Sequence, residues 1–475
     1  MTDVYKTTLM YKKIIETDIE IFKSLVGEEN VYLDAETLEI NSKDYTENLS
    51  FMPEVVIIPA NVSEISGVVK YCNLNLIPVT TRGAGTGLSG GALPVMGGVV
   101  LNLKELNHII QIDEQNLQAI VEPGVINEDL QNAAKAKNLF YPPDPASKGS
   151  CSLGGNIAHS SGGPKAVKYG TTKDYVLNLE VVLANGDIIN TGANVLKNST
   201  GYNITQLMVG SEGTLGIVTK IVLKLIPLPR FDYLMLACFE NNIDACKNVA
   251  MLFQAGLTPS ACEFITVRAL QTSLSFLGKT FEYPPQSKAF LLIEFDGNHL
   301  NTLEEEALQA SEILYASNCL EIYTFDSADQ KENIWKIRRS IGEAAKHGNV
   351  YKEEDTVIPR FYLPELLSEI DRIEKEYNFR TIIYGHAGDG NLHINILKDD
   401  LDNDYWQHKI PEAINQIFAK CFELGGTISG EHGIGHVQRP YFHKFMDPKI
   451  IEIYKSIKKS LDPNLVLNPS KIWIV

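Results

Sequence analysis

The chain has 475 residues, 44% of them hydrophobic and 21% charged, which is typical of a soluble globular protein of two or three domains. A formal net charge of −17 argues against nucleic acid or an anionic membrane as a partner held by bulk electrostatics. Seven scattered cysteines without a C-x-x-C pair indicate reduced thiols and exclude a ferredoxin-type iron–sulfur motif, and we expect neither a signal peptide nor a transmembrane segment.

The first half of the chain reads as a helical segment followed by a glycine-rich α+β unit. Residues 1–50 form the predicted N-terminal helical segment. From VVIIPA onward the pattern predicts strand, helix and strand, with Ser63 as the helix cap. GVVLNL, AIVEPGV, NLEVVLANGDII and LGIVTKIVLKLIPL add β segments, the third with a turn at Asn185-Gly186. Residues 51–228 are therefore predicted to be one domain.

The second half predicts another α+β unit over residues 229–430. Strands and helices alternate in FDYLMLACFE, NNIDACKNVAMLFQAG, KAFLLIEFDG and LNTLEEEALQASEILYASN. This alternation predicts an antiparallel sheet covered by helices on one face. Residues 431–475 change in character to GEHGIGHVQRP, a helix and a tail rich in turn residues. We expect this last segment to pack back on the first unit.

The stretch TTRGAGTGLSGG, residues 80–91, contains the G-x-G-x-x-G pattern of a nicotinamide-binding turn. That reading requires a helix after the glycines, and Pro94 and Gly97-Gly98 oppose one. We interpret the run as a phosphate-binding loop whose backbone N–H groups converge on an anion, with Arg82 adding positive charge. Two more glycine-rich segments, residues 142–174 and 210–218, follow. Three such loops favour FAD over a mononucleotide, whereas tight packing turns are the alternative.

The histidines gather late in the sequence. TIIYGHAGDGNLHINIL predicts a hairpin that brings His386 and His393 to facing strands. In GEHGIG, Glu431 stands beside His432. Two imidazoles and a carboxylate are a candidate site for a divalent metal with positions left for substrate, and hydrogen-bonded structural histidines are the alternative. His436 is left out, because glycines between it and His432 oppose a helical pair.

A cationic patch lies in ENIWKIRRSIGEAAKHGNVYKEEDTVIPR. Arg338 stands three residues after Trp335, on the same helical face, and is expected to point inward. Arg339 is expected on a solvated helix face. Lys352 lies near the start of an apparent strand.

Six motifs, RGAGTGLSGG, PPDPAS, CSLGGNIAHSSGG, GSEGTLGIVT, YGHAGDGNLHINI and GEHGIG, occur in this order over residues 53–473. In this set the chain resembles the FAD-dependent D-2-hydroxyacid dehydrogenases of the vanillyl-alcohol-oxidase type. That group includes D-lactate dehydrogenases, the flavin subunit of glycolate oxidase and D-2-hydroxyglutarate dehydrogenase. The resemblance implies an α+β fold with a bipartite PCMH-type FAD-binding domain of two α+β subdomains, an α+β cap domain with an antiparallel sheet, and a C-terminal segment that returns to the FAD domain.

The resemblance also implies roles for individual residues. His432 would be the catalytic base, Arg338 and Lys352 would hold the substrate carboxylate, and Asn395 would line the substrate side. A divalent metal, with Zn²⁺ preferred, would be held by His386, His393 and Glu431. The residues implied in FAD binding are Arg82, Gly83, Ala84, Gly85, Thr86, Gly87, Leu88, Pro143, Asp144, Ser147, Gly154, Gly155, Asn156, Ala158, Ser160, Gly216, Ile217, Val218 and Asn468.

The chain departs from this family at three places. Its first glycine loop reads RGAG, without the histidine that tethers FAD in some flavoproteins of this fold, so we expect FAD to bind non-covalently. Gly342 stands where the hydroxyglutarate enzyme has a hydroxyl side chain, and Ser470 stands where glycine is usual.

The activity implied is oxidation of a small D-2-hydroxy acid to the 2-oxo acid, with hydride passing to FAD. Electrons would then go to a quinone, an electron-transfer flavoprotein or an iron–sulfur subunit. The alternatives are a peroxide-forming oxidase, a flavin redox subunit without turnover, and an alkyl transferase of the same fold, which would need no metal. We expect a cytoplasmic location, with peripheral attachment to the inner face of the membrane as an alternative, and a homodimer is compatible with the sequence.

Overall fold

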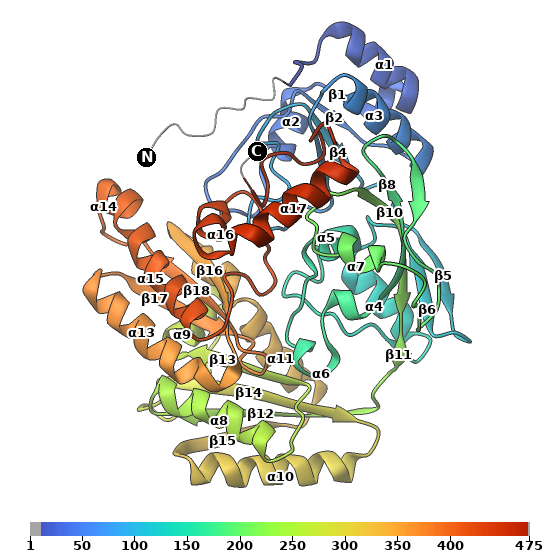
Figure 1. Cartoon of the computed structure of the whole chain (residues 1–475). Coiled ribbons are helices and arrows are strands. Elements are labelled where there is room, and N and C mark those ends of the chain that lie inside the picture. The colour runs from blue at the N-terminus through green and yellow to red at the C-terminus, as the bar shows by residue number, and fades with distance from the viewer. Residues whose placement is uncertain (1–10, 474–475) are drawn as a thin grey trace.

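The computed structural model describes residues 11–473, and Figure 1 shows two α+β units joined by a C-terminal segment. The first unit holds a four-stranded sheet in the order β1-β2-β4-β3, in which β2 and β3 run parallel to β4. A five-stranded antiparallel sheet follows in the order β5-β6-β10-β8-β9. The strands of this unit are β1 (Val31–Tyr32), β2 (Val55–Ile57), β3 (Val79–Arg82), β4 (Val99–Asn102), β5 (Ile109–Asp113), β6 (Gln118–Val121), β7 (Leu139–Phe140), β8 (Val176–Val182), β9 (Ile188–Asn190), β10 (Ile217–Lys224) and β11 (Ile226–Pro227).

The helices of this unit follow from local sequence, with two differences from expectation. They are α1 (Glu16–Val26), α2 (Ala35–Asn41), α3 (Val62–Leu74), α4 (Asn127–Lys135), α5 (Leu153–His159), α6 (Ala166–Tyr169) and α7 (Ile204–Met208). The cap of α3 is Asn61, whose side chain accepts the N–H of Glu64, so the helix begins ahead of Ser63. The long glycine-rich segment is not all loop, because Ser152 caps α5 within it. The residues between β3 and β4 form no helix, as predicted.

The second unit is built on a seven-stranded antiparallel sheet in the order β15-β12-β14-β13-β17-β18-β16. Its strands are β12 (Phe231–Phe239), β13 (Ala261–Thr266), β14 (Ala289–Gly297), β15 (Cys319–Phe325), β16 (Tyr351–Val357), β17 (Arg380–Gly385) and β18 (Asn391–Leu397). Its helices are α8 (Asn242–Gln254), α9 (Val267–Leu277), α10 (Leu300–Ala316), α11 (Ala328–Arg339), α12 (Ile341–Lys346), α13 (Leu363–Glu376), α14 (Asn403–His408) and α15 (Ile410–Glu423).

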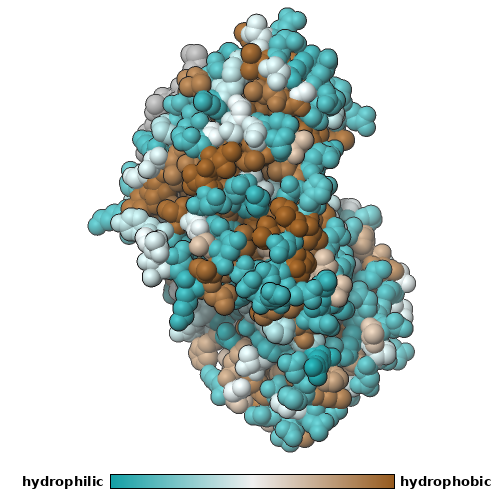
Figure 2. Space-filling model, turned by 90° about the vertical axis from the view of Figure 1, so that its right-hand side faces the viewer, coloured by the Kyte–Doolittle hydropathy of each residue, from teal (hydrophilic) through white to brown (hydrophobic). Residues whose placement is uncertain are grey.

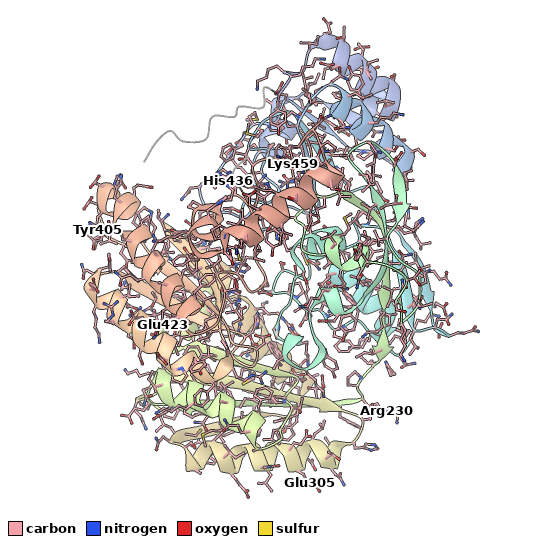
Figure 3. The ribbon with its side chains drawn as sticks, viewed as in Figure 1. Arg230, Glu305, Tyr405, Glu423, His436 and Lys459 are labelled. Atoms are coloured by element: carbon pink, nitrogen blue, oxygen red, sulfur yellow. The ribbon has the colours of Figure 1, made fainter. Side chains whose placement is uncertain are left out.

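Helices cover both faces of this sheet, and the expectation of one covered face was wrong. One core packs α8, α10, α13 and α15 against the sheet, and a second core packs α9, α11 and α12 against the other face. The reason is visible in β14, where AFLLIEF is buried at every position instead of alternating. Arg230, labelled in Figure 3, lies where the chain passes from the first unit to the second, and its N–H donates to the carbonyl of Gly297.

The C-terminal segment returns to the first sheet, as the fold class predicts. It contains α16 (Arg439–Phe445) and α17 (Pro448–Leu461). Beyond them Leu467 pairs in parallel with Val79 at the edge of β3. The buried ammonium of Lys458 donates to the carbonyls of Thr214 and Leu467, which fastens α17 to the FAD side. The first unit is therefore completed by the last residues that the structure describes.

One face of the molecule separates hydrophilic from hydrophobic residues. Figure 2 shows hydrophilic residues over most of the lower part of one face, with hydrophobic residues gathered in its upper half. No helix within residues 11–473 is long and apolar enough to cross a bilayer.

Candidate active site

A cavity of about 690 Å³ lies between the two units and the C-terminal segment, within the range usual for ligand sites. The first glycine loop, α5 and the start of β10 form one end of it. Residues of α11, α12, the β17–β18 hairpin and the GEHGIG loop form the other end. A long cofactor and a small substrate can thus meet inside one cavity.

Most residues that were predicted to bind FAD line this cavity. They are Gly83, Ala84, Gly85, Thr86, Gly87, Leu88, Ser147, Gly154, Gly155, Asn156, Ala158, Gly216, Ile217, Val218 and Asn468. Glycine is required at Gly154, because a Cβ there would lie 2.7 Å from Cβ of Pro123. Bare backbone along a long cavity fits a pyrophosphate cofactor, because N–H groups can approach its oxygens without obstruction.

Four residues predicted for FAD do not line the cavity. The guanidinium of Arg82 donates to the carbonyl of Lys43 and lies against Gly85, so it supports the loop from behind. The carbonyl of Pro143 accepts from Asn127, inside the first unit. The other two are Asp144, which pairs with Arg339, and Ser160, which ends α5 in a left-handed conformation.

The three residues predicted to bind metal come together. Oε1 of Glu431 lies 3.4 Å from Nε2 of His386 and 3.4 Å from Nε2 of His393. All three ligand atoms lie within 4.8 Å of one another. The predicted hairpin explains this, because His393 lies opposite Tyr384 in the sheet and His386 begins the turn.

The protonation states of this cluster suit a cation. Burial lowers the pKa of His393 to about 4, with help from the charge of His432, which leaves its imidazole neutral. Burial raises the pKa of Glu431, but the imidazoles outweigh it and hold that pKa at about 2. Burial also opposes charge on His386, yet Glu263 and Glu431 raise its pKa well above the ordinary value. Positive charge is therefore favoured between these carboxylates, as a proton or as a metal ion.

Glu263 on β13 orients His386 from behind. Its carboxylate oxygens lie 2.9 and 3.0 Å from Nδ1 of His386, which leaves Nε2 directed at Glu431. A carboxylate behind an imidazole ligand fixes its tautomer in this way. Glu263 is fully buried and also contacts Arg338 at 2.5 Å.

The GEHGIG loop is held by buried carboxylates on two sides. Oδ2 of Asp355 on β16 accepts the N–H groups of Gly430, Glu431 and His432, each at 2.8 Å. From the first unit, Glu212 accepts the N–H groups of the following residues, Ile434 at 2.8 Å and Gly435 at 2.7 Å. Consecutive N–H groups around a carboxylate form a strong charge-assisted set.

His432 is the residue predicted to be the catalytic base, and it lines the cavity. Its ring stacks on that of His393, with centroids 5.0 Å apart and planes at 12°. Its carbonyl accepts the hydroxyl of Ser89, which follows the first glycine loop. His436, labelled in Figure 3, is outside this group, because its ring contacts Phe51 and its N–H donates to Ser89.

The cations near the site differ from those expected. Arg338 is buried in the cavity wall, as predicted, but Arg339 also lines the cavity instead of facing solvent. Lys352 does not reach the cavity. Its ammonium lies 5.5 Å from the ring centroid of Trp406, because alternate residues of β16 face opposite sides. Lys346 of α12 takes a place in the wall.

Asn395 is fully buried and is not among the residues that line the cavity. It lies opposite Glu353 in the β16–β18 pair, and Glu353 does line the cavity. The departure at Gly342 has a steric reason, because a Cβ there would lie 2.8 Å from the hydroxyl of Tyr384. At the other departure, Ser470 accepts a hydrogen bond from Arg439.

Several functional residues escaped sequence reasoning. Glu263, Asp355 and Glu212 lie in unremarkable segments and act only through partners far away in the sequence. Strand periodicity places Glu353 on the same face of β16 as Asp355, but it does not say which face of the strand meets the cavity.

The fold and the cavity define a flavoprotein with a PCMH-type FAD-binding domain, a cap domain and FAD as its cofactor. Residues 53–192 match the FAD binding domain family, and residues 228–472 match the C-terminal domain of FAD linked oxidases. Solved structures share the fold at low identity. p-Cresol methylhydroxylase with substrate bound superposes with a TM-score of 0.77 at 19% identity, with 96% of each chain covered. An alkyldihydroxyacetonephosphate synthase gives 0.75 at 17% identity, with 97% of this chain and 86% of that chain covered.

Curated relatives cover nearly the whole chain. A D-lactate dehydrogenase of Anaerostipes hadrus is 38% identical, with 97% of this chain and 98% of the relative covered. Glycolate oxidase subunit GlcD of Bacillus subtilis is 39% identical, with 91% and 92% covered. D-2-hydroxyglutarate dehydrogenase of Stutzerimonas stutzeri is 34% identical, with 96% and 98% covered. The chain therefore belongs to the FAD-linked oxidase family that includes these hydroxyacid dehydrogenases.

Proposed function

We propose that the protein oxidises a small D-2-hydroxy acid to the 2-oxo acid and passes the electrons to a separate acceptor. The observation that carries this proposal is the convergence of His386, His393, Glu431 and His432 at one end of the FAD cavity. The names of the relatives point to the same chemistry.

An alcohol loses hydride only if its hydroxyl proton leaves as the bond breaks. His432 is placed to take that proton at the cavity wall, a contribution of typically ~100- to 10,000-fold. Stacking on His393 and the hold of Asp355 on its N–H keep the imidazole in place. FAD, when bound, supplies the hydride acceptor.

The two histidines and Glu431 would hold the metal ion, whose chemistry is Lewis-acid polarisation of the substrate hydroxyl. Zn²⁺ suits their nitrogen and oxygen donors, and three protein ligands leave a position open. Arg338 would receive the substrate carboxylate, because its Nε lacks a hydrogen-bond acceptor among the residues that the structure describes. A buried guanidinium with free N–H groups binds a carboxylate strongly.

The acceptor after FAD is proposed to be a quinone, an electron-transfer flavoprotein or an iron–sulfur subunit. The sequence contains no C-x-x-C pair to carry electrons onward within this chain. A peroxide assay during turnover separates this proposal from an oxidase, since an oxidase would form one peroxide for each substrate.

Anaerobic reduction of the flavin is the direct test. D-2-Hydroxy acids should bleach the oxidised flavin absorbance, and L enantiomers should not. His432→Ala should retain FAD and lose reduction by at least roughly 100-fold, because no base replaces the imidazole. Normal reduction of this variant would show that another group takes the proton.

A further inference from the structure

Cations that line the cavity within residues 11–473 are all matched by carboxylates. The matched atoms are Arg338 Nη2 and Glu263 Oε2 at 2.5 Å, Arg339 Nη2 and Asp144 Oδ2 at 3.0 Å, and Lys346 Nζ and Glu353 Oε2 at 2.9 Å. A substrate anion must therefore use a cation that keeps free donors, and the three pairs differ in this respect.

Arg338 keeps donors for one carboxylate. Its Nε has no hydrogen-bond acceptor among the described residues, although the residue is only 3% exposed. Its partner Glu263 is shared, because both oxygens of that carboxylate also contact His386. The planar guanidinium presents several N–H groups at once, so it can serve Glu263 and a ligand together.

Lys346 is in a different position. Its ammonium is a compact charge, and Glu353 neutralises it within the cavity wall. Lys346 approaches Glu353 at Oε2, and the carboxylate also lines the cavity, so it is presented to a ligand on that side. Arg339 likewise keeps an Nε without an acceptor among the described residues, so the site offers free donors at the two arginines and a carboxylate at Glu353.

Glu353 also lies close to the reacting groups. Its ligand atom and those of His393 and His432 all fall within 4.8 Å of one another. A substrate whose hydroxyl meets His432 must place the rest of its carbon chain near Glu353. A neutral tail meets no penalty there, whereas a second carboxylate faces a like charge.

We propose that Glu353 makes the site selective for 2-hydroxy acids with a single carboxylate and a short neutral tail, against dicarboxylic 2-hydroxy acids. This inference rests on the proposed function and narrows its substrate class. Two unit charges about 5 Å apart at an effective dielectric constant of about 20 repel enough for a discrimination of roughly 100-fold in kcat/KM.

The test compares monocarboxylates, D-lactate and D-2-hydroxybutyrate, with dicarboxylates, D-malate and D-2-hydroxyglutarate, in anaerobic flavin reduction by the holoenzyme. The wild type should favour the monocarboxylates by roughly 100-fold in kcat/KM. Glu353→Gln keeps the shape, removes the repulsion and frees the ammonium of Lys346, so the ratio should move towards dicarboxylates by at least roughly 30-fold. A wild type that prefers a dicarboxylate, or an unchanged ratio in Glu353→Gln, would overturn the inference and leave the proposed function intact.

The matched control is Glu332→Gln, which removes the same charge from an exposed position of α11 outside the cavity. Water screens this residue, so the ratio should change by less than about 3-fold. An equal shift in both variants would overturn the specific role of Glu353 in favour of bulk charge. In Glu353→Gln/Lys346→Gln the repulsion is still removed but no free ammonium remains, so the gain should be smaller than in Glu353→Gln, and an equal gain would contradict the pairing of Lys346 with Glu353.

Binding supplies a readout that needs no turnover. Pyruvate should raise the unfolding midpoint of the wild-type holoenzyme more than 2-oxoglutarate does at equal concentration, and Glu353→Gln should narrow or reverse that difference. Greater stabilisation of the wild type by 2-oxoglutarate would overturn the inference. If no hydroxy acid bleached the flavin of any variant, the proposed function itself would fail, and this binding comparison would still decide whether the cavity rejects a second carboxylate.

Discussion

Asp355 fastens the loop that carries Glu431 and His432, and Asp355→Asn tests how far the site depends on it. The carboxylate is buried, and its Oδ2 accepts three consecutive N–H groups at 2.8 Å together with the hydroxyl of Ser429 at 2.9 Å. An asparagine has the same size but one oxygen and no charge. In the wild type, the side-chain NH₂ group of Asn391 donates to Oδ1 of Asp355 at 2.7 Å. If the new asparagine turns its oxygen towards the loop, its own NH₂ group faces that donor, and neither group has an acceptor.

The magnitude follows from the number of donors. Hydrogen bonds to a charged acceptor contribute about 1.5–3 kcal/mol and those to a neutral acceptor about 0.5–1.5 kcal/mol, so each loses about 1 kcal/mol. Four donors converge on Oδ2, so the summed loss of hydrogen-bond free energy is about 4 kcal/mol. Small movements of the loop in the variant reduce this loss. We expect the closed loop to lose about 2–4 kcal/mol relative to its open states, or about 30- to 1,000-fold in population.

Hydrogen exchange of residues 429–435, read by mass spectrometry on the holoenzyme, measures this directly. Protection should fall by about 30-fold or more, and kcat/KM should fall at least as far, while flavin content stays unchanged. Glu354→Gln is the matched control on the same strand. Burial raises the pKa of Glu354 to about 7 and Gln438 donates to it, so a neutral amide fits there. Unaltered loop protection and activity in Asp355→Asn would refute the reasoning.

Three further predictions concern the metal, the cofactor and the contact between the units. Chelation with dipicolinate should slow flavin reduction at least roughly 10-fold without bleaching the flavin, and Zn²⁺ should restore it; an unaffected rate would remove the metal from the mechanism. Gly154→Val should lower the flavin-to-protein absorbance ratio, because the new Cβ would lie 2.7 Å from Cβ of Pro123. Full flavin content would contradict a role of this glycine backbone in FAD binding. Lys165→Met leaves the buried carboxylate of Glu294 without a cation, while Asp296 keeps Lys168, so the unfolding midpoint should fall by several degrees, consistent with a loss of about 3–5 kcal/mol. An unfolding midpoint within one degree of wild type would show that water hydrates the unpaired carboxylate in the variant.

Local signals were enough to predict the parts of the site that lie in one stretch of sequence. The glycine loop and the absence of a helix after it follow from Pro94 and the glycines, and the structure agrees. The turn between His386 and His393 also has a local signal, so the hairpin could be predicted. Glu431 became a candidate ligand through its place beside His432 in a glycine-flanked segment, and the resemblance then matched it to the metal ligands.

The errors have one physical cause, which is that strand pairing and register are set by distant residues. Lys352 and Glu353 are neighbours, and only the pairing of β16 with β18 decides which of them faces the cavity. The second covered face of the cap sheet is a similar case, because a continuous apolar strand such as β14 does not reveal how many helices will cover it. The ion pair of Arg339 with Asp144 joins residues of different domains, and no local pattern predicts it.

The reacting groups are assembled by both domains at once. The GEHGIG loop donates N–H hydrogen bonds to Asp355 of the cap sheet and to Glu212 of the FAD domain, and the hydroxyl of Ser89 donates to the carbonyl of His432. Neither domain alone could fix that loop, because each satisfies only a part of its N–H groups. Contacts between the domains, such as that of Lys165 with Glu294, therefore position the base as well as stabilise the fold. It follows that a substitution at this contact can lower the rate of flavin reduction while every residue of the cavity is unchanged.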